Sequence, residues 1–239
     1  MERALLLFDV DGTLMDAGGS GRAALRAAML EVFGEAGPIE TYDFHGRTDP
    51  AIVRGLLREV GWDDERIERR STDLWPAYFA HLEQELVERT DEVSALEGVT
   101  LLLTTICQGE LRGRYSTGLL TGNMERGAWA KLRSCALSQF FDFGAFGSDA
   151  EQRDELPGVA LARAEEHTGQ PFRTDAAVVI GDTPYDIQCA RAGGVRMLAV
   201  ATGRHTAREL ADCGAESVLE NLTDTGRVLR ALEESLVAR

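Results

Sequence analysis

The chain has 239 residues, of which 44% are hydrophobic, and its 40 acidic and 25 basic residues give a formal net charge of −15. This charge argues against a general nucleic-acid or anionic-membrane surface, because binding to phosphate backbones depends on clustered Lys and Arg. No stretch approaches the roughly 18 consecutive apolar residues of a membrane span and no export segment precedes the first strand, so we expect a cytoplasmic protein. Four widely spaced cysteines predict reduced thiols.

The first predicted element is a buried strand that ends in two carboxylates. The apolar run from Leu5 to Phe8 leads directly into Asp9-Val10-Asp11-Gly12-Thr13. Strand residues two apart share a face at about 6–7 Å, so Asp9 and Asp11 are expected to point into one small volume. Two like charges about 4 Å apart repel by about 4 kcal/mol at an effective dielectric near 20. A cation is therefore expected between them, and carboxylate oxygens suit a hard ion such as Mg²⁺.

The segment 18–88 is predicted to be helical throughout. The glycine-rich stretch 16–21 leads into this segment, and its composition is typical of a hinge. Apolar residues at helical spacing then predict helices ending near Gly34, over 50–60 with Thr48 or Asp49 as its N-cap, and over 75–86 with Pro76 in its first turn.

From about residue 97 the pattern changes to strands that alternate with helices. A helix is expected at 99–106, although its threonines are poor helix formers. The next expected elements are a strand at 116–123, a helix at 124–136, a strand at 143–146, a helix at 157–168, a strand at 176–180, a helix at 185–193, a strand at 195–200 and helices near 206–213 and 223–238.

Repeated strand–helix units predict an α/β fold with a Rossmann-like parallel sheet and helices on both faces. Ligands of such sheets bind beyond the carboxyl ends of the strands, where Asp9, Asp11, Thr121 and Asp182 all fall. The helical segment 18–88 is then an insertion at that same edge, placed like a lid. We therefore expect a core of residues 1–17 and 89–239 and an inserted α-helical cap of residues 18–88.

Three motifs carry a resemblance to a known family. "DVDGTL" at 9–14, "LLTGN" at 119–123 and "GDTPYD" at 181–186 resemble, in order and spacing, the motifs of the haloacid dehalogenase-like hydrolase superfamily. The helical insertion is similar to that of the members with a small α-helical cap, among them the phosphoglycolate phosphatases. The resemblance implies Mg²⁺-dependent phosphoryl transfer through an aspartyl phosphate.

The resemblance also implies a role for each matching residue. Asp9 would be the nucleophile, and Asp11 would protonate the leaving alcohol and then deprotonate the attacking water. Mg²⁺ would be held by Asp9, the backbone carbonyl of Asp11, and Asp182. Phosphoryl oxygens would be bound around Thr121, which is expected to contribute to catalysis, with further contacts from Thr13, Gly122 and Asn123. Asp186 is expected to orient the basic residue or the metal shell.

The basic catalytic residue is where the sequence departs from the family. Most members place a lysine about thirty residues after the threonine of the second motif, but here Arg153 stands in that region. An arginine supplies the same charge with a different geometry. The one lysine of the sequence, Lys131, is the alternative; two turns into the helix after Thr121, it is expected at the surface, and we therefore favour Arg153.

The loop His45-Gly46-Arg47-Thr48 has two readings. It can be a loop that simply leads into the next helix, or it can descend from the cap into the site, as the corresponding loop does in related phosphatases, with Arg47 on the substrate. Arginines near the site would help an acidic protein to capture an anion. The four histidines, His45 among them, share no spacing typical of metal ligands.

Several activities of the superfamily can be set aside. Dehalogenases need neither Asp11 nor Asp182, and phosphonatases need a cap lysine, which residues 16–98 lack. A β-phosphoglucomutase stays open, although the hinge carries no histidine. A phosphoacceptor signalling module, as in response regulators, is the alternative from another class, but receivers lack the insertion and a second Asp like Asp11. The prediction is a phosphoglycolate phosphatase-like hydrolase of a small phosphorylated metabolite.

Overall fold

The computed structural model describes residues 3–108 and 111–237. Its main sheet has the order β5 (Gly144–Ala145), β4 (Tyr115–Leu120), β1 (Ala4–Phe8), β6 (Ala177–Gly181), β7 (Arg196–Val200) and β8 (Val218–Leu219). Every neighbouring pair is parallel. The predicted α/β class with a Rossmann-like parallel sheet is confirmed.

Strand β1 lies at the centre of this sheet because both of its faces are apolar. All five of its residues are buried. Leu6 and Phe8 belong to the apolar cluster on one face of the sheet, and Leu5 and Leu7 belong to the cluster on the other. Such burial on both sides is typical of a parallel strand that is covered by helices above and below.

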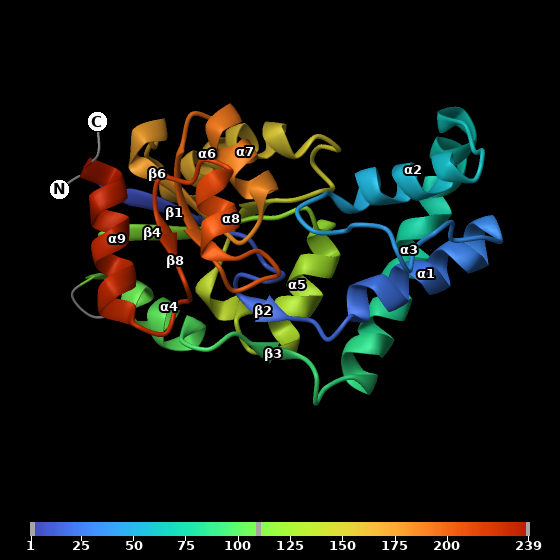
Figure 1. Cartoon of the computed structure of the whole chain (residues 1–239), viewed down its shortest axis with the longest axis horizontal. Coiled ribbons are helices and arrows are strands. Elements are labelled where there is room, and N and C mark those ends of the chain that lie inside the picture. Colours follow the sequence, from blue (N-terminus) through green and yellow to red (C-terminus); the bar gives the residue numbers. More distant parts are fainter. Residues whose placement is uncertain (1–2, 109–110, 238–239) are drawn as a thin grey trace.

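Helices cover both faces of the sheet (Figure 1). One face packs on α4 (Val99–Cys107), α5 (Glu125–Ser134) and α9 (Thr225–Val237), and the other on α6 (Leu156–Thr168) and α7 (Pro184–Ala192). The short helix α8 (Ala207–Asp212) adds a small cluster beside β7. No helix among residues 3–108 and 111–237 is long and apolar enough to cross a bilayer.

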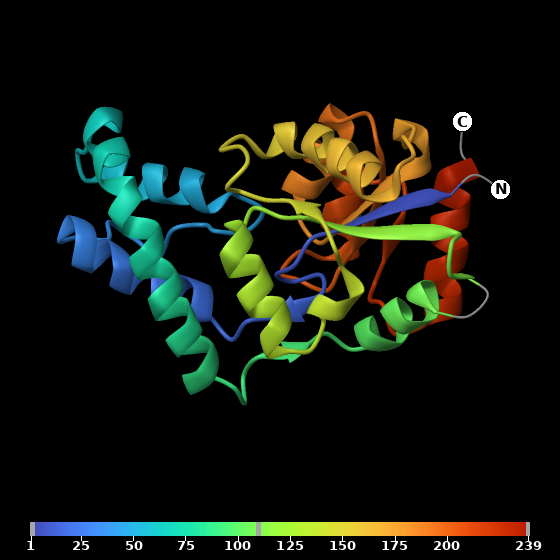
Figure 2. The ribbon, with the colours of Figure 1, turned by 180° about the vertical axis from the view of Figure 1, so that it is seen from behind.

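Three helices form a separate block beside the sheet, on the right in Figure 1 and on the left in Figure 2. They are α1 (Ser20–Phe33), α2 (Asp49–Glu59) and α3 (Asp64–Glu88). Their buried apolar side chains form a cluster of their own, which also includes Ala36 and Ile39 from the segment between α1 and α2 and Ala130 from α5. The block is joined to the sheet domain by an antiparallel ribbon of β2 (Met15–Asp16) and β3 (Ser94–Ala95).

The structure corrects the prediction for the last of these helices. Pro76 lies in the middle of α3 instead of in its first turn. The helix begins at Asp64, twelve residues before Pro76. There the side chain of Asp63 accepts a hydrogen bond from the Arg66 N–H at 2.8 Å. The charged stretch 64–73 buries little besides Ile67, so its apolar pattern is too sparse to reveal the first turns. The two-residue strands β2, β3 and β8 were also not predicted.

Candidate active site

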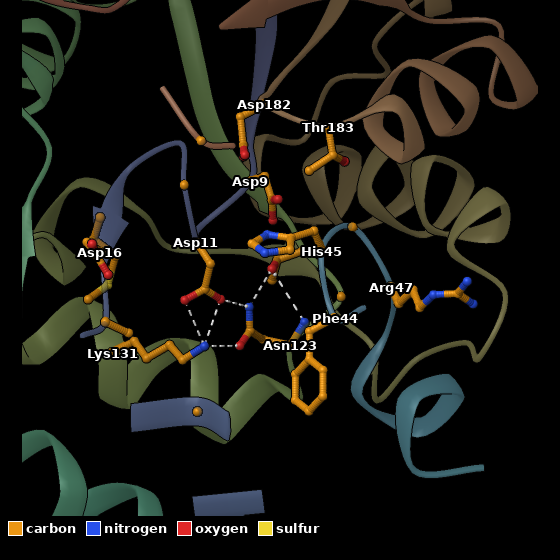
Figure 3. Close-up of a pocket in the computed structure, with 18 of the residues that line it drawn as sticks. Asp9, Asp11, Asp16, Phe44, His45, Arg47, Asn123, Lys131, Asp182 and Thr183 are labelled. Carbon is orange, nitrogen blue, oxygen red and sulfur yellow. Dashed lines mark hydrogen bonds and ion pairs between the residues drawn. The ribbon is translucent and has the colours of Figure 1, made fainter. Parts of the chain in front are cut away.

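A cavity of about 500 Å³ lies between the carboxyl edge of the sheet and the helical block. Its walls include Asp9 and Asp11 after β1, the loop 121–123 after β4, and Asp182 after β6. The loop 44–49, which leads into α2, forms the opposite wall. Figure 3 shows side chains from both sides pointing into this space.

Three carboxylates form a buried acidic cluster at this edge. Ligand oxygens of Asp9, Asp182 and Asp186 all lie within 4.8 Å of one another. Asp182 accepts a hydrogen bond from the Thr13 hydroxyl at 2.9 Å through Oδ1, whereas its buried Oδ2 accepts none from the described part of the chain. A Cβ added at Gly12 or Gly203 would lie within 2.6 Å of that Oδ2, so a larger residue at either position would have to displace the Asp182 carboxylate.

These residues fit a divalent cation. Asp9 and Asp182 present oxygens toward each other, and the unsatisfied Oδ2 of Asp182 is the kind of buried acceptor that a hard metal ion completes. Asp186 is already engaged, because it accepts hydrogen bonds from the backbone N–H and the hydroxyl of Thr183 at 3.0 and 2.7 Å. The position of Asp186 outside the metal shell stays a prediction.

Arg153 lies against the acidic cluster. Its guanidinium lies 3.3 Å from Asp9 Oδ2, donates to Asp186 Oδ1, and donates to the Gly46 carbonyl at 3.0 Å. Only 6% of its side chain is exposed. Burial nevertheless raises the pKa of Asp9 to about 6, against the opposing effect of Arg153. Burial, with Asp186 nearby, also raises the pKa of Asp182 well above its usual range.

Lys131 also points into the site, and the expectation that it lies at the surface was wrong. Its side chain is 6% exposed, and Nζ lies 2.9 and 2.7 Å from the two carboxylate oxygens of Asp11. The buried face of α5 includes Ala128, Lys131 and Leu132, which is the apolar spacing of one helix face. That spacing was present in the sequence and could have placed the lysine inward.

A polar network connects Lys131 to the residues of the second motif (Figure 3). Lys131 donates to Asn123 Oδ1 at 2.6 Å, and Asn123 Nδ2 donates to Asp11 Oδ2 at 2.7 Å and to Thr121 Oγ1 at 2.8 Å. Burial would raise the pKa of Asp11, but Lys131 and the Asn123 amide outweigh it, so that pKa lies below its usual value. Thr121 itself is fully buried.

The loop 46–49 packs directly on the loop after β4. The Asp49 N–H donates to the Gly122 carbonyl at 2.8 Å, and a Cβ added at Gly122 would lie 2.1 Å from the Arg47 carbonyl oxygen. The Arg47 side chain points away from Asp9 and Asp11 in Figure 3. Its guanidinium lies 5.7 and 5.4 Å from the ring centres of Tyr42 and Tyr185. Contact between Arg47 and a substrate therefore stays a prediction.

His45 lines the cavity, although only Arg47 of its loop was predicted from the sequence as a site residue. Its ring, which is solvent-exposed, lies between Asp9 and Asn123 in the view of Figure 3. Partial burial and the nearby Arg204 lower its pKa.

Comparisons with known proteins agree with this geometry. The model of a family described as haloacid dehalogenase-like hydrolase matches residues 6–200. A phosphoglycolate phosphatase of Nitrosospira multiformis is 25% identical over 94% of this chain and 95% of its own. A hydrolase structure from Pseudomonas syringae aligns over 100% of both chains with a TM-score of 0.70 and 22% identity. A candidate β-phosphoglucomutase from Bacteroides vulgatus aligns over 99% of this chain and 91% of its own, with a TM-score of 0.70 and 20% identity.

Proposed function

Because this chain belongs to the haloacid dehalogenase-like hydrolases, we propose that it is a Mg²⁺-dependent phosphatase that hydrolyses a small phosphomonoester through an aspartyl phosphate on Asp9. The observation that carries this proposal is the buried cluster of Asp9, Asp182 and Asp186 with Arg153 against it. Relatives described as phosphoglycolate phosphatases support a small substrate of that type. We expect the enzyme to act in the cytoplasm.

The residues have distinct parts in the proposed reaction. Asp9 and Asp182, with the Asp11 carbonyl, would hold Mg²⁺, which when bound offsets the negative charge of the carboxylates and the phosphoryl group. A carboxylate oxygen of Asp9 attacks phosphorus while the bond from phosphorus to the leaving oxygen breaks. Asp11, which must carry a proton at this step although Lys131 outweighs burial and holds its pKa low, gives that proton to the leaving oxygen. Asp11 then takes a proton from water, whose oxygen attacks phosphorus and releases Asp9.

Charge on the transferring group must be stabilised from several sides, because it spreads over three equatorial oxygens. In this proposal the Thr121 hydroxyl and the amides around Gly122 donate to those oxygens. Arg153 balances the charge of Asp9 and the phosphoryl group from the side of Asp186. Thr13 supports the site indirectly, since its hydroxyl is directed to Asp182.

Substrate choice is expected to lie in residues 18–88, which we propose act as a cap over the core formed by 1–17 and 89–239. A mutase is the second candidate, because a solved structure described as a candidate β-phosphoglucomutase shares the whole fold. A panel of phosphorylated metabolites, ranked by kcat/KM, separates the two, since a phosphatase releases inorganic phosphate and a mutase returns an isomeric phosphosugar.

Hydrolysis of p-nitrophenyl phosphate tests the proposal directly. We expect activity that EDTA abolishes and Mg²⁺ restores, and we expect Asp9→Asn to remove it because the amide is a poor nucleophile. Asp212→Asn is the matched control, since this carboxylate is 74% exposed on α8 and should leave the rate unchanged. Wild-type turnover in the Asp9→Asn enzyme would contradict the assignment of the nucleophile.

A further inference from the structure

Lys131 uses all of its hydrogen-bonding capacity inside the protein. An ammonium group has three N–H donors, and three acceptors surround Nζ: the two oxygens of Asp11 at 2.9 and 2.7 Å and Asn123 Oδ1 at 2.6 Å. No donor is left over for a substrate. The lysine therefore differs in kind from Arg153, whose contacts lie on the other side of the site with Asp9, Asp186 and the Gly46 carbonyl.

The lysine dictates how the Asn123 amide is turned. Because an ammonium cannot accept a hydrogen bond, Asn123 must present Oδ1 to it, which leaves Nδ2 for the acceptors beside it. Nδ2 donates to Asp11 Oδ2 at 2.7 Å and to Thr121 Oγ1 at 2.8 Å. Thr121 Oγ1 is thus an acceptor from Asn123, and its own hydrogen is free to point elsewhere.

We propose that Lys131 is a positioning residue that, through Asn123, fixes both the Asp11 carboxylate and the direction of the Thr121 hydroxyl hydrogen toward the phosphoryl oxygens. This inference rests on the proposed phosphatase activity. Under this proposal the two cations of the site have separate tasks. Arg153 balances the charge on Asp9, whereas Lys131 holds Asn123 and Asp11 in place. A donor held in place before the reaction stabilises the transition state without reorganisation.

Helices α1 and α3 come close to Lys131. A Cβ added at Gly21 in α1 would lie 3.3 Å from Lys131 Nζ and 3.9 Å from the Tyr78 hydroxyl of α3. A longer side chain at position 131 has no room there. Methionine is therefore the appropriate substitution, because it keeps an unbranched chain of similar length and removes the three donors and the charge.

A double-mutant cycle tests the proposal in steady-state kinetics. We expect Lys131→Met to lower kcat for p-nitrophenyl phosphate about 100-fold, as misplaced catalytic groups do, with KM changed by less than about threefold because no lysine donor reaches the substrate. If Lys131 acts through Asn123, the Lys131→Met/Asn123→Ala double variant should lose little more than the worse single variant. Losses that multiply, or an unchanged kcat in Lys131→Met, would overturn the proposal.

Arg133→Met is the matched control. Arg133 is exposed on the same helix, two positions along, so its loss should leave kcat and KM at the wild-type values. Equal thermal midpoints of Lys131→Met and Arg133→Met would show that the kinetic loss does not come from unfolding of α5.

A second measurement does not depend on activity. Lys131 is the single lysine of the sequence, so protein labelled with ¹⁵N-lysine has one side-chain ammonium signal. A buried ammonium with three bonded hydrogens exchanges slowly with water, and we expect this signal in the wild type and in Arg133→Met but not in Asn123→Ala. Absence of the signal in the wild type, or its persistence in Asn123→Ala, would overturn the network. If the wild type hydrolyses no phosphomonoester, the proposed function fails, and this measurement alone decides on the network.

Discussion

Arg153 brings a positive charge to three buried carboxylates and so links the stability of the core to the chemistry of the site. We expect Arg153→Ala to destabilise the protein by about 3–5 kcal/mol, because the carboxylates lose their buried partner. Arg153→Lys should lower the free energy of unfolding by a smaller amount, since lysine keeps the charge but not the forked geometry. Urea unfolding with and without Mg²⁺ measures the free energy of unfolding of each variant. Mg²⁺ should reduce the difference in this free energy between Arg153→Ala and wild type.

The control for this prediction is Arg69→Ala. Arg69 pairs with Glu65 at 3.0 Å, but the two side chains are 63% and 81% exposed, so its loss should cost no more than about 1 kcal/mol. Equal destabilisation by the two alanine variants would mean that burial of the ion pairs of Arg153 does not increase their contribution to the free energy of unfolding.

The sequence identified the acidic residues of the site better than the basic ones. Asp9 and Asp182 follow apolar strands, and the ends of parallel strands meet at one edge, so their convergence followed from local pattern. Lys131 was misplaced because a lysine within a helix is usually solvated. Its inward direction depends on the phase of α5 and on a partner, Asp11, that lies far away in the sequence.

The N-terminus of α2 is the element that ties the cap to the loop after β4. Asp49 donates its N–H to the Gly122 carbonyl, and its carboxylate accepts from the Met124 N–H at 2.8 Å. Burial raises the pKa of Asp49 to about 6, only partly opposed by Lys131. Because the folded-state pKa exceeds that of the unfolded chain, ionised Asp49 lowers the free energy of unfolding as the pH rises through about 6.

Asp49→Asn should therefore become more stable relative to wild type between about pH 4 and pH 6, with a constant advantage at higher pH. Urea midpoints of the two proteins across this range measure the effect. Asp43→Asn is a control of opposite sign. Burial opposes ionisation of Asp43, but hydrogen bonds from the His45 N–H and from Arg204 lower its pKa, so that variant should be less stable than wild type near neutral pH. A pH-independent difference for Asp49→Asn would contradict the assigned pKa.

Elements were predictable where they carried a repeated pattern. Helix α4 was found despite its threonines, and strand β6 was evident from its β-branched run. The ribbon of β2 and β3 was missed because two residues cannot show a period, and its pairing joins positions on either side of the cap. The position of Pro76 was wrong because a sparse apolar pattern hid the first turns of α3.

In the molecule as a whole, the cap has its own apolar cluster and meets the core through a seam that includes ion pairs and closely packed loops. Arg54 pairs with Glu151 at 2.9 Å, and Arg204 pairs with Asp43 at 2.6 Å. The bounds of the cap, proposed from the glycine-rich stretch 16–21, stay a prediction. The seam could not be predicted, because its contacts join residues roughly 100 or more positions apart.

Gly147 tests how far this seam controls the site. A Cβ there would lie 2.1 Å from the Gly122 carbonyl oxygen and 3.3 Å from Thr48 Cβ, so Gly147→Ala must displace the loop that carries Thr121 and Asn123. We expect a loss of about 1–3 kcal/mol in the free energy of unfolding, as for other overpacked sites, and a lower kcat for p-nitrophenyl phosphate. Gly158→Ala is the matched control: a Cβ there meets nothing within 4 Å, and alanine favours its helix, so that variant should be as stable as wild type or up to about 1 kcal/mol more stable. If Gly147→Ala matched Gly158→Ala in both urea unfolding and turnover, close packing between position 147 and the loop 121–123 could not be what holds that loop in place.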